Sequence, residues 1–135
     1  LEDGGHLYTF EINDEQEDFT RPWIEQSPWA DRITFLIGDA ITEAPRLGVS
    51  FDLAFIDGDK RTYRETYEMA LSVVRKGGFI LADNTLWDGH VVDPSYGKDQ
   101  QTHGIVSFND YVRQDSRVER VILPLRDGLT LIRKL

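Results

Sequence analysis

Residues 51–60 have the sequence FDLAFIDGDK. Apart from Asp52, the first six residues form a continuous apolar run, which is typical of a β-strand that is covered on both faces. The polar residues from Asp57 onward mark the point where this strand ends. Because ligands of parallel α/β sheets bind beyond the carboxyl ends of the strands, the segment also indicates where a site would lie.

Strand-like and helix-like stretches alternate on both sides of this segment. Further strands are expected over residues 7–12, 33–37, 79–82, 118–123 and 129–132, and helices after Asn13 or Asp14 and over 42–47, 61–75 and 104–114, with a loop over 87–101. Pro22 is expected to kink the first helix or to start a new segment. The pair Gly77-Gly78 is expected to end the third helix. The pattern predicts an α/β fold with a mostly parallel sheet and an antiparallel C-terminal hairpin around Asp127-Gly128.

Length and composition exclude several classes of protein. The 135 residues suit a single domain, and the net charge of -9 disfavours nucleic acid and anionic membranes as partners. No stretch is apolar for long enough to cross a bilayer. The chain contains no cysteine, which excludes disulfides and thiolate metal sites and is compatible with a cytoplasmic location.

Three oxygen-bearing side chains follow two expected strands that would be neighbours. Asp57 follows the strand over 51–56, and Asp83 and Asn84 follow the next one. Two carboxylates and one amide oxygen suit Mg²⁺, Mn²⁺ or Ca²⁺ and leave positions for water or substrate oxygens. Each residue taken alone is better explained as a helix cap or a turn residue. The three together favour a metal site.

Lys60 follows Asp57 by three residues. One interpretation is a surface ion pair, which would contribute little to stability. The other is a general base in a closed site. The spacing supports both interpretations equally.

Two acidic residues earlier in the chain are candidates for cofactor binding. Glu11 ends the first strand, where an acid can accept both hydroxyls of a ribose, although it would also suit the N-terminus of the following helix. Asp39 follows Gly38, where the backbone can approach a ligand closely. An ordinary turn acid explains Asp39 at least as well.

Several of these segments together resemble the cation-dependent O-methyltransferases, the family that includes caffeoyl-CoA and catechol O-methyltransferases and many bacterial relatives. The matching segments are 7–13, 37–40, 55–60 and 77–92, with 104–109 and 117–130 in the tail. The combination of Asp57-Gly-Asp-Lys60 with Asp83-Asn-Thr-Leu-Trp87 is specific to the family. The resemblance covers essentially the whole chain.

The resemblance implies a role for each candidate residue. Asp57, Asp83 and Asn84 would bind the metal, and Lys60, beside Asp57, would take the substrate proton. The cofactor S-adenosylmethionine would lie against residues of several segments, namely Glu11 with Ile12, the turn Gly38-Asp39-Ala40, Asp57 and Asp59. The implied fold is the Rossmann-like sheet of class I methyltransferases, and we also expect a homodimer.

One departure from the family pattern is large. Family members carry N-terminal helices, then a strand and a glycine-rich turn that hold the methionine part of the cofactor. The present chain begins just before the second strand of that sheet, so we expect a partial domain over residues 1–135 that lacks the first strand. Three outcomes are then possible: the strands that end at Glu11 and at Asp57 pair directly, another chain fills the gap, or a further N-terminal part of the protein fills it. The third is the one we expect.

The function expected from these residues is methyl transfer from S-adenosylmethionine to a phenolic hydroxyl with the help of Mg²⁺ or a similar cation. We expect the 135-residue chain by itself to be inactive. One alternative is a Mg²⁺-dependent phosphohydrolase, prompted by the Asp-x-Asp of Asp57 and Asp59. The other is a catalytically dead fragment that serves as an interaction module.

Overall fold

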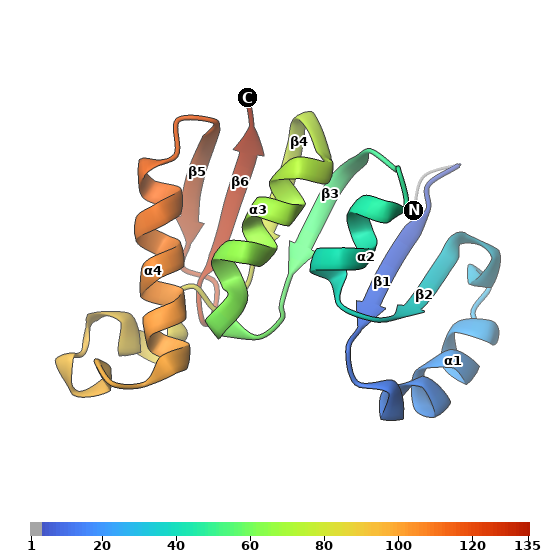
Figure 1. The fold of residues 1–135 in the computed structure, drawn as a ribbon, viewed down its shortest axis with the longest axis horizontal. Coiled ribbons are helices and arrows are strands. Elements are labelled where there is room, and N and C mark those ends of the chain that lie inside the picture. Colours follow the sequence, from blue (N-terminus) through green and yellow to red (C-terminus); the bar gives the residue numbers. More distant parts are fainter. Residues whose placement is uncertain (1–3) are drawn as a thin grey trace. The chain divides into compact units, whose positions relative to one another are not determined.

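The computed structural model describes residues 4–135, which form two compact units, the first ending at Leu47 and the second beginning at Gly48. Their strands form two separate sheets, β1-β2 and β3-β4-β6-β5 (Figure 1). Among the described residues, no helix combines the length and the apolar character needed to cross a membrane.

The first unit contains two strands and two helices. They are β1 (Leu7–Glu11), α1 (Glu17–Glu25), β2 (Ile33–Ile37) and α2 (Ala40–Arg46). The strands are parallel, with Leu7 opposite Ile33 and Glu11 opposite Ile37. Both strands were expected, and α2 begins two residues earlier than predicted because the Asp39 carboxylate accepts a hydrogen bond from the Ile41 amide at 2.9 Å.

Pro22 does not start a new segment, because α1 continues through it to Glu25. The residues before α1 form a 3₁₀ turn, Asp14–Gln16, capped by the Asn13 side chain. Pro22 is therefore only the sixth residue of the α-helix, and its missing N–H removes a single intrahelical hydrogen bond.

The second unit is a four-stranded mixed sheet with two helices. They are β3 (Phe51–Ile56), α3 (Tyr63–Val73), β4 (Val74–Ala82), α4 (Gln100–Gln114), β5 (Val118–Leu123) and β6 (Leu129–Lys134). β3 and β4 are parallel, whereas β6 is antiparallel to both β4 and β5. This confirms the α/β class with an antiparallel C-terminal hairpin. The expectation of a single domain over residues 1–135 stays a prediction.

The sequence suggested that the pair Gly77-Gly78 ends the third helix, but this expectation is wrong. α3 stops at Val73 and β4 begins at Val74, so Gly77 and Gly78 lie inside the strand. The register of β3 and β4 shifts there, because Phe51 pairs with Val74 and Leu53 with Phe79. Gly77 has a φ of +74°, and a Cβ on Gly78 would lie 2.9 Å from the Asp52 carbonyl. The glycines therefore permit a bulge in the strand.

The region expected as one loop over residues 87–101 contains short helical turns, Trp87–Val92 and Pro94–Tyr96, and the start of α4. α4 begins at Gln100, four residues earlier than predicted, because Asp99 caps it. The Asp99 carboxylate accepts a hydrogen bond from the Thr102 amide at 2.7 Å.

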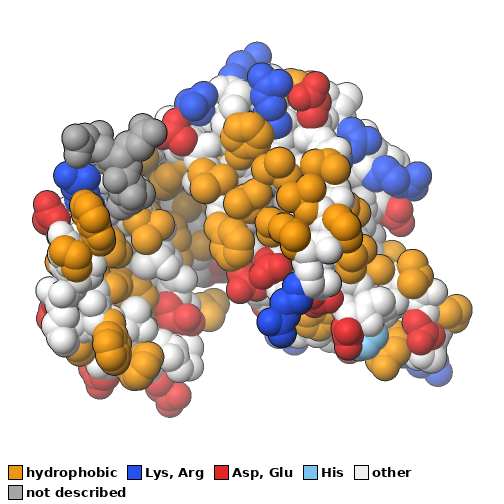
Figure 2. Space-filling view, turned by 180° about the vertical axis from the view of Figure 1, so that it is seen from behind, with side chains coloured by type: hydrophobic (Ala, Val, Ile, Leu, Met, Phe, Trp, Pro, Cys, Tyr) orange, Lys and Arg blue, Asp and Glu red, His pale blue; other side chains and the backbone are white. Residues whose placement is uncertain are grey.

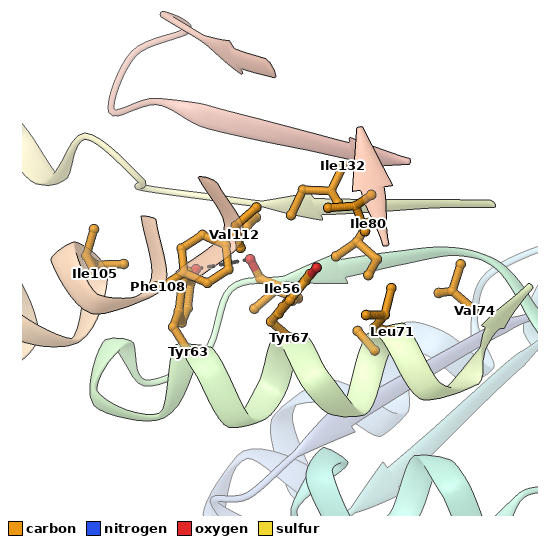
Figure 3. Close-up of a cluster of buried hydrophobic side chains, with 13 residues drawn as sticks. Ile56, Tyr63, Tyr67, Leu71, Val74, Ile80, Ile105, Phe108, Val112 and Ile132 are labelled. Carbon is orange, nitrogen blue, oxygen red and sulfur yellow. Dashed lines mark hydrogen bonds between the residues drawn. The ribbon is translucent and has the colours of Figure 1, made fainter. Parts of the chain in front are cut away.

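The core of the second unit lies between the sheet and the two helices α3 and α4 (Figure 3). Phe108 of α4 packs edge-on against Tyr63 and Tyr67 of α3, with ring centroids 5.3 Å and 5.9 Å apart. Both tyrosines are completely buried. These aromatic contacts hold α3 and α4 together at the end of the sheet where β3 and β4 stop.

Within the second unit, no helix covers the opposite face of this sheet, contrary to the expectation that β3 is covered on both faces. Leu53 and Phe55 of β3 are 52% and 59% exposed, and Phe79 lies beside Leu53 on β4. Figure 2 shows hydrophobic side chains gathered over this face, seen from behind the helices. Helices α3 and α4 cover one face of the sheet only.

Candidate active site

Two candidate carboxylates are brought together at the ends of β3 and β4. In these parallel strands Ile56 pairs with Ala82, so Asp57 and Asp83 each follow the last paired residue. The Asp83 amide donates to the Ile56 carbonyl at 3.0 Å, which continues the ladder beyond the strands. The sequence-based expectation that these residues meet at one edge of the sheet is confirmed.

Lys60 is buried at this edge, with 6% of its surface exposed. Its Nζ donates hydrogen bonds to Asp57 Oδ1 at 3.1 Å and to the Tyr63 hydroxyl at 2.7 Å. Nζ also lies 4.4 Å from the centroid of the Tyr63 ring. The interpretation of Lys60 as an exposed surface ion pair is therefore wrong, whereas its role as a base stays a prediction.

Tyr63 connects Lys60 to the two strands. Its hydroxyl lies 3.1 Å from the Ile56 carbonyl and 2.8 Å from the Asp83 carbonyl, and either can accept its single proton. Burial raises the pKa of Tyr63 well above its ordinary value, and the charges of Asp57 and Asp83 raise it further. The phenol therefore stays protonated and serves to position the Lys60 amine.

Helix α4 covers Lys60 at close range. The Gln101 side-chain oxygen accepts a hydrogen bond from the Lys60 amide at 3.1 Å. A Cβ on Gly104 would lie 2.2 Å from the Lys60 carbonyl oxygen. Only glycine permits this approach of the helix, and the approach is what removes Lys60 from solvent.

Asn84 has an unusual backbone and a defined side-chain partner. Its φ is +57°, a conformation that non-glycine residues rarely adopt. The Asn84 amide donates to Asp83 Oδ1 at 2.8 Å, and Asn84 Nδ2 donates to Asp127 Oδ2 at 3.3 Å. Because Nδ2 faces Asp127, Asn84 Oδ1 is the amide atom left for a ligand.

The donor set fits a hard divalent cation. Asp57, Asp83 and Asn84 offer carboxylate and amide oxygens, the ligands that Mg²⁺ and Mn²⁺ prefer. Among residues 4–135, no three His, Asp and Glu side chains are grouped so that they could hold a metal ion. Two carboxylates and one amide would therefore need further oxygens from water or substrate.

Asp59 is engaged by its own neighbour. It caps the 3₁₀ turn Lys60–Thr62 by accepting a hydrogen bond from the Arg61 amide at 3.0 Å, and it also pairs with the Arg61 guanidinium. The hydrogen bond from the Arg61 side chain lowers the pKa of Asp59 to about 2. Asp59 is thus an anion in the structure, and its role beside cofactor or substrate stays a prediction.

The candidate cofactor residues Glu11, Ile12, Gly38, Asp39 and Ala40 belong to the first unit, where β1 and β2 end side by side. Gly38 donates its amide hydrogen to the Glu11 carbonyl at 2.8 Å. Glu11 Oε1 accepts from the Asn13 amide at 2.8 Å, and Ile12 is 75% exposed. Asp39 caps α2, which begins at Ala40. The structure brings these five residues together, and their contact with a cofactor stays a prediction.

Three residues of the site escaped the sequence analysis. Tyr63 lay within the helix expected over 61–75, Gln101 in an expected loop and Asp127 in an expected turn. The spacing of three residues between Lys60 and Tyr63 could have indicated a contact along one helical face. Nothing in the sequence connects Gln101 or Asp127 with residues more than forty positions away.

A separate hollow of about 730 Å³ lies on the outer side of α3 and α4. Its lining includes Arg64, Asp110 and Arg117, and it contains none of the candidate site residues. The candidate site residues at the strand ends therefore do not line this hollow.

Comparisons with known proteins agree with this arrangement. The family model described as O-methyltransferase matches residues 1–135. Tricin synthase 2 from Oryza sativa subsp. japonica is 37% identical to this chain, and the match covers 100% of this chain and 50% of that protein. Caffeoyl-CoA O-methyltransferase 1 from Eucalyptus globulus is 33% identical, and the match covers 100% of this chain and 59% of that protein. The O-methyltransferase from Bacillus cereus, solved in complex with S-adenosylhomocysteine, is 28% identical with a TM-score of 0.88 over 98% of this chain and 64% of that one.

The chain spans between half and two thirds of the length of these relatives. The match nevertheless extends over all the residues that build the strand ends, including Asp57, Lys60, Asp83 and Asn84. The chain therefore belongs to the O-methyltransferase family.

Proposed function

We propose that the protein transfers the methyl group of S-adenosylmethionine to a phenolic hydroxyl, one of a vicinal pair, with the help of a divalent cation. The observation that carries the proposal is a buried lysine paired with Asp57 at the end of β3, next to the end of β4 that carries Asp83 and Asn84. Its membership of the O-methyltransferase family supports methyl transfer. Relatives named caffeoyl-CoA O-methyltransferase support an aromatic acceptor.

Asp57, Asp83 and Asn84 would hold the cation. When bound, it would supply positive charge that lowers the pKa of a neighbouring hydroxyl. A free phenol has a pKa of about 10, so ionisation near neutral pH needs such help. Mg²⁺, Mn²⁺ and Ca²⁺ all suit these oxygen ligands.

Lys60 would take the proton of the phenol. In its neutral form, Nζ accepts the proton and later releases it to solvent, while the Tyr63 hydroxyl holds Nζ in place at 2.7 Å. The phenolate oxygen attacks the methyl carbon as the carbon–sulfur bond breaks. The sulfur keeps the electron pair of that bond, and the products are an aryl methyl ether and S-adenosylhomocysteine.

The residues that would bind the cofactor are those that the resemblance to the family implied. Glu11 would accept the ribose hydroxyls, with Ile12 and the turn Gly38-Asp39-Ala40 beside the adenosine. Asp57 and Asp59 are the further residues that we propose for cofactor binding. S-adenosylhomocysteine bound in the structure from Bacillus cereus supports this class of cofactor.

The phosphohydrolase alternative needs Asp57 and Asp59 as a pair of catalytic carboxylates. Asp59 instead caps the turn Lys60–Thr62 and is paired with Arg61. Its engagement leaves the Asp-x-Asp pattern without a second free carboxylate. Methyl transfer is therefore favoured, and a generic phosphate ester serves as the control substrate.

The test uses the protein expressed from its complete reading frame, with S-adenosylmethionine, a catechol and Mg²⁺. Formation of a methyl catechol and S-adenosylhomocysteine in equal amounts, abolished by a chelator and restored by Mg²⁺, is the expected result. Product formed at an equal rate with chelator present would overturn the metal requirement. Absence of product under all conditions, with hydrolysis of the phosphate ester, would favour the alternative.

A further inference from the structure

The loop that follows β4 holds three non-glycine residues in the left-handed region. Asn84, Trp87 and Asp88 have φ values of +57°, +48° and +51°. Each such residue costs on the order of 1 kcal/mol and persists only where surrounding contacts hold it. Asn84 is the candidate metal ligand in this loop, so the contacts that hold the loop also determine where its amide lies.

The turn between β5 and β6 supplies these contacts. The Thr85 amide donates to the Gly128 carbonyl at 3.0 Å, and the Leu86 amide donates to the Asp127 carbonyl at 2.9 Å. A Cβ on Gly128 would lie 2.5 Å from Leu86 Cγ, so only glycine lets the turn dock this closely. The backbone of the hairpin turn is therefore bonded directly to the loop that carries Asn84.

The side chain of Asp127 makes two further contacts with the same loop. Its Oδ2 accepts from Asn84 Nδ2 at 3.3 Å, and its Oδ1 accepts from the Asp88 amide. A carboxylate can only accept hydrogen bonds from these donors, whereas an asparagine amide has one donating and one accepting end. Asp127 therefore selects one of the two orientations of the Asn84 amide, with Nδ2 toward Asp127 and Oδ1 away from it.

We infer that Asp127 is a positioning residue that fixes the Asn84 amide oxygen in the orientation required for binding a divalent cation. The inference rests on the proposed metal site at Asp57, Asp83 and Asn84. Asp127 itself acts through Asn84, because its two carboxylate oxygens are taken by Asn84 and Asp88. Residues that orient metal ligands in this way typically change metal affinity by about 10- to 100-fold when they are replaced.

The test measures binding of Mn²⁺ alone by the electron paramagnetic resonance signal of free Mn²⁺, in the protein from its complete reading frame. Asp127→Asn keeps the size of the side chain but replaces one accepting oxygen by an NH₂ group. This NH₂ group then faces one of the two donors of the loop, Asn84 Nδ2 or the Asp88 amide. We expect the Mn²⁺ dissociation constant to rise by roughly 10- to 100-fold.

The matched control is Glu119→Gln, which removes one carboxylate from the far end of the same hairpin, where Glu119 pairs with Arg133. It should change affinity by about twofold or less because solvent screens that charge.

A double-mutant cycle separates orientation from simple loss of negative charge. In an Asn84→Ala background no amide remains to be oriented, so Asp127→Asn should lower Mn²⁺ affinity by only about twofold more. A loss of equal size in both backgrounds would show that Asp127 acts through its charge, and the inference would be wrong. Equal affinity of the wild type and Asp127→Asn would also overturn it while leaving the metal site intact. Absence of Mn²⁺ binding by the folded wild type would overturn the metal site and, with it, this inference.

A second variant keeps the test decisive if Asp127→Asn lowers stability, which thermal unfolding reports. The exchange Asn84→Asp with Asp127→Asn reverses the hydrogen bond, because the amide introduced at position 127 could donate to the carboxylate introduced at position 84 and still accept from the Asp88 amide. Mn²⁺ binding should return to within about tenfold of the wild type, since ligand and partner are again complementary. Failure of this exchanged pair to bind Mn²⁺ although it folds would count against the inference.

Discussion

At the residue scale, Lys60 shows how burial changes the meaning of a short motif. In the sequence it was equally compatible with a surface ion pair and with a catalytic base. In the structure its amine is enclosed between Asp57, the Tyr63 hydroxyl and the Tyr63 ring. A cation is rarely buried without a charged partner and hydrogen bonds, and here both are present. Such an arrangement is typical of a functional group.

Replacing Lys60 by Ala should lower kcat by roughly 10²- to 10⁴-fold and leave the affinity for S-adenosylmethionine nearly unchanged, because a general base acts in the chemical step. The loss should shrink as the pH rises toward about 10, where a phenol ionises without help. Tyr63→Phe removes only the hydroxyl that holds Nζ and should have a smaller effect of the same kind. Initial rates from pH 6 to 10 check both, with Lys98→Ala, which changes an exposed lysine, as control. A loss from Lys60→Ala that stays constant with pH would argue against the base.

At the element scale, packing partners decided where helices begin and end. The stop of α3 at Val73 is made by Lys134 of β6, whose Nζ donates to the carbonyls of Leu71 and Val74 at 2.7 Å each. Gly77 and Gly78, which looked like the stop signal, instead allow the bulge in β4. The glycine pair thus predicted one end for α3, and the bonds from Lys134 lie at another. The helix ends where Lys134 bonds to it.

Gly104→Ala should destabilise the second unit by about 1–3 kcal/mol, because the new methyl group would overlap the Lys60 carbonyl and push α4 away. The free energy of unfolding in urea measures this effect. Gly58→Ala is the matched control, since a Cβ there meets no atom within 4 Å. Equal stability of Gly104→Ala and the wild type would mean that α4 does not lie against the Lys60 turn as described.

Asp115 joins the end of α4 to α3 and should make stability depend on acid pH. It accepts a hydrogen bond from the Tyr67 hydroxyl at 2.8 Å and pairs with Arg117, which lowers the pKa of the Asp115 carboxyl from 3.8 to about 2. Because the folded pKa is the lower one, this stabilisation is complete above about pH 4 and is lost as the pH falls toward 2.

Asp115→Asn should therefore cost about 1.5–3 kcal/mol of unfolding free energy at pH 7, the range for hydrogen bonds to a charged group. The difference from the wild type should narrow between pH 4 and pH 2. Urea unfolding at several pH values measures this, with Asp110→Asn, an exposed partner of Arg113 on the same helix, as control. A difference that stays constant down to pH 2 would contradict the assignment.

At the scale of the whole molecule, the candidate residues are divided between two units. Glu11 and the turn Gly38–Ala40 lie in a unit with its own two-stranded sheet, whereas Lys60, Asp83 and Asn84 lie in the other. The expectations of a homodimer and of a cytoplasmic location stay predictions.

The 135-residue chain alone is expected to give no methylated catechol with S-adenosylmethionine and Mg²⁺, whereas the protein from its complete reading frame should. The reason is that the 135-residue chain spans only 50% to 64% of the length of the relatives it matches, and methyl transfer requires its reactants to be held in line. Product analysis by mass spectrometry, with equal molar amounts of both proteins, measures the difference. Comparable turnover by the two would contradict this expectation.

The sequence by itself determined the class of fold, the positions of the strands apart from the first part of β4, and the identity of the polar residues at their ends. These features follow from local patterns, because an apolar run and its polar terminus are readable over six to ten residues. Only the tertiary structure decided that Lys60 is buried, that Tyr63 and Gln101 bond to it, and that the Asn84 side chain donates a hydrogen bond to Asp127. Contacts between residues 41 or 43 positions apart leave no periodic trace in one sequence. It also decided that β3 is covered on one face, because an apolar run looks the same whether its second face is packed or open.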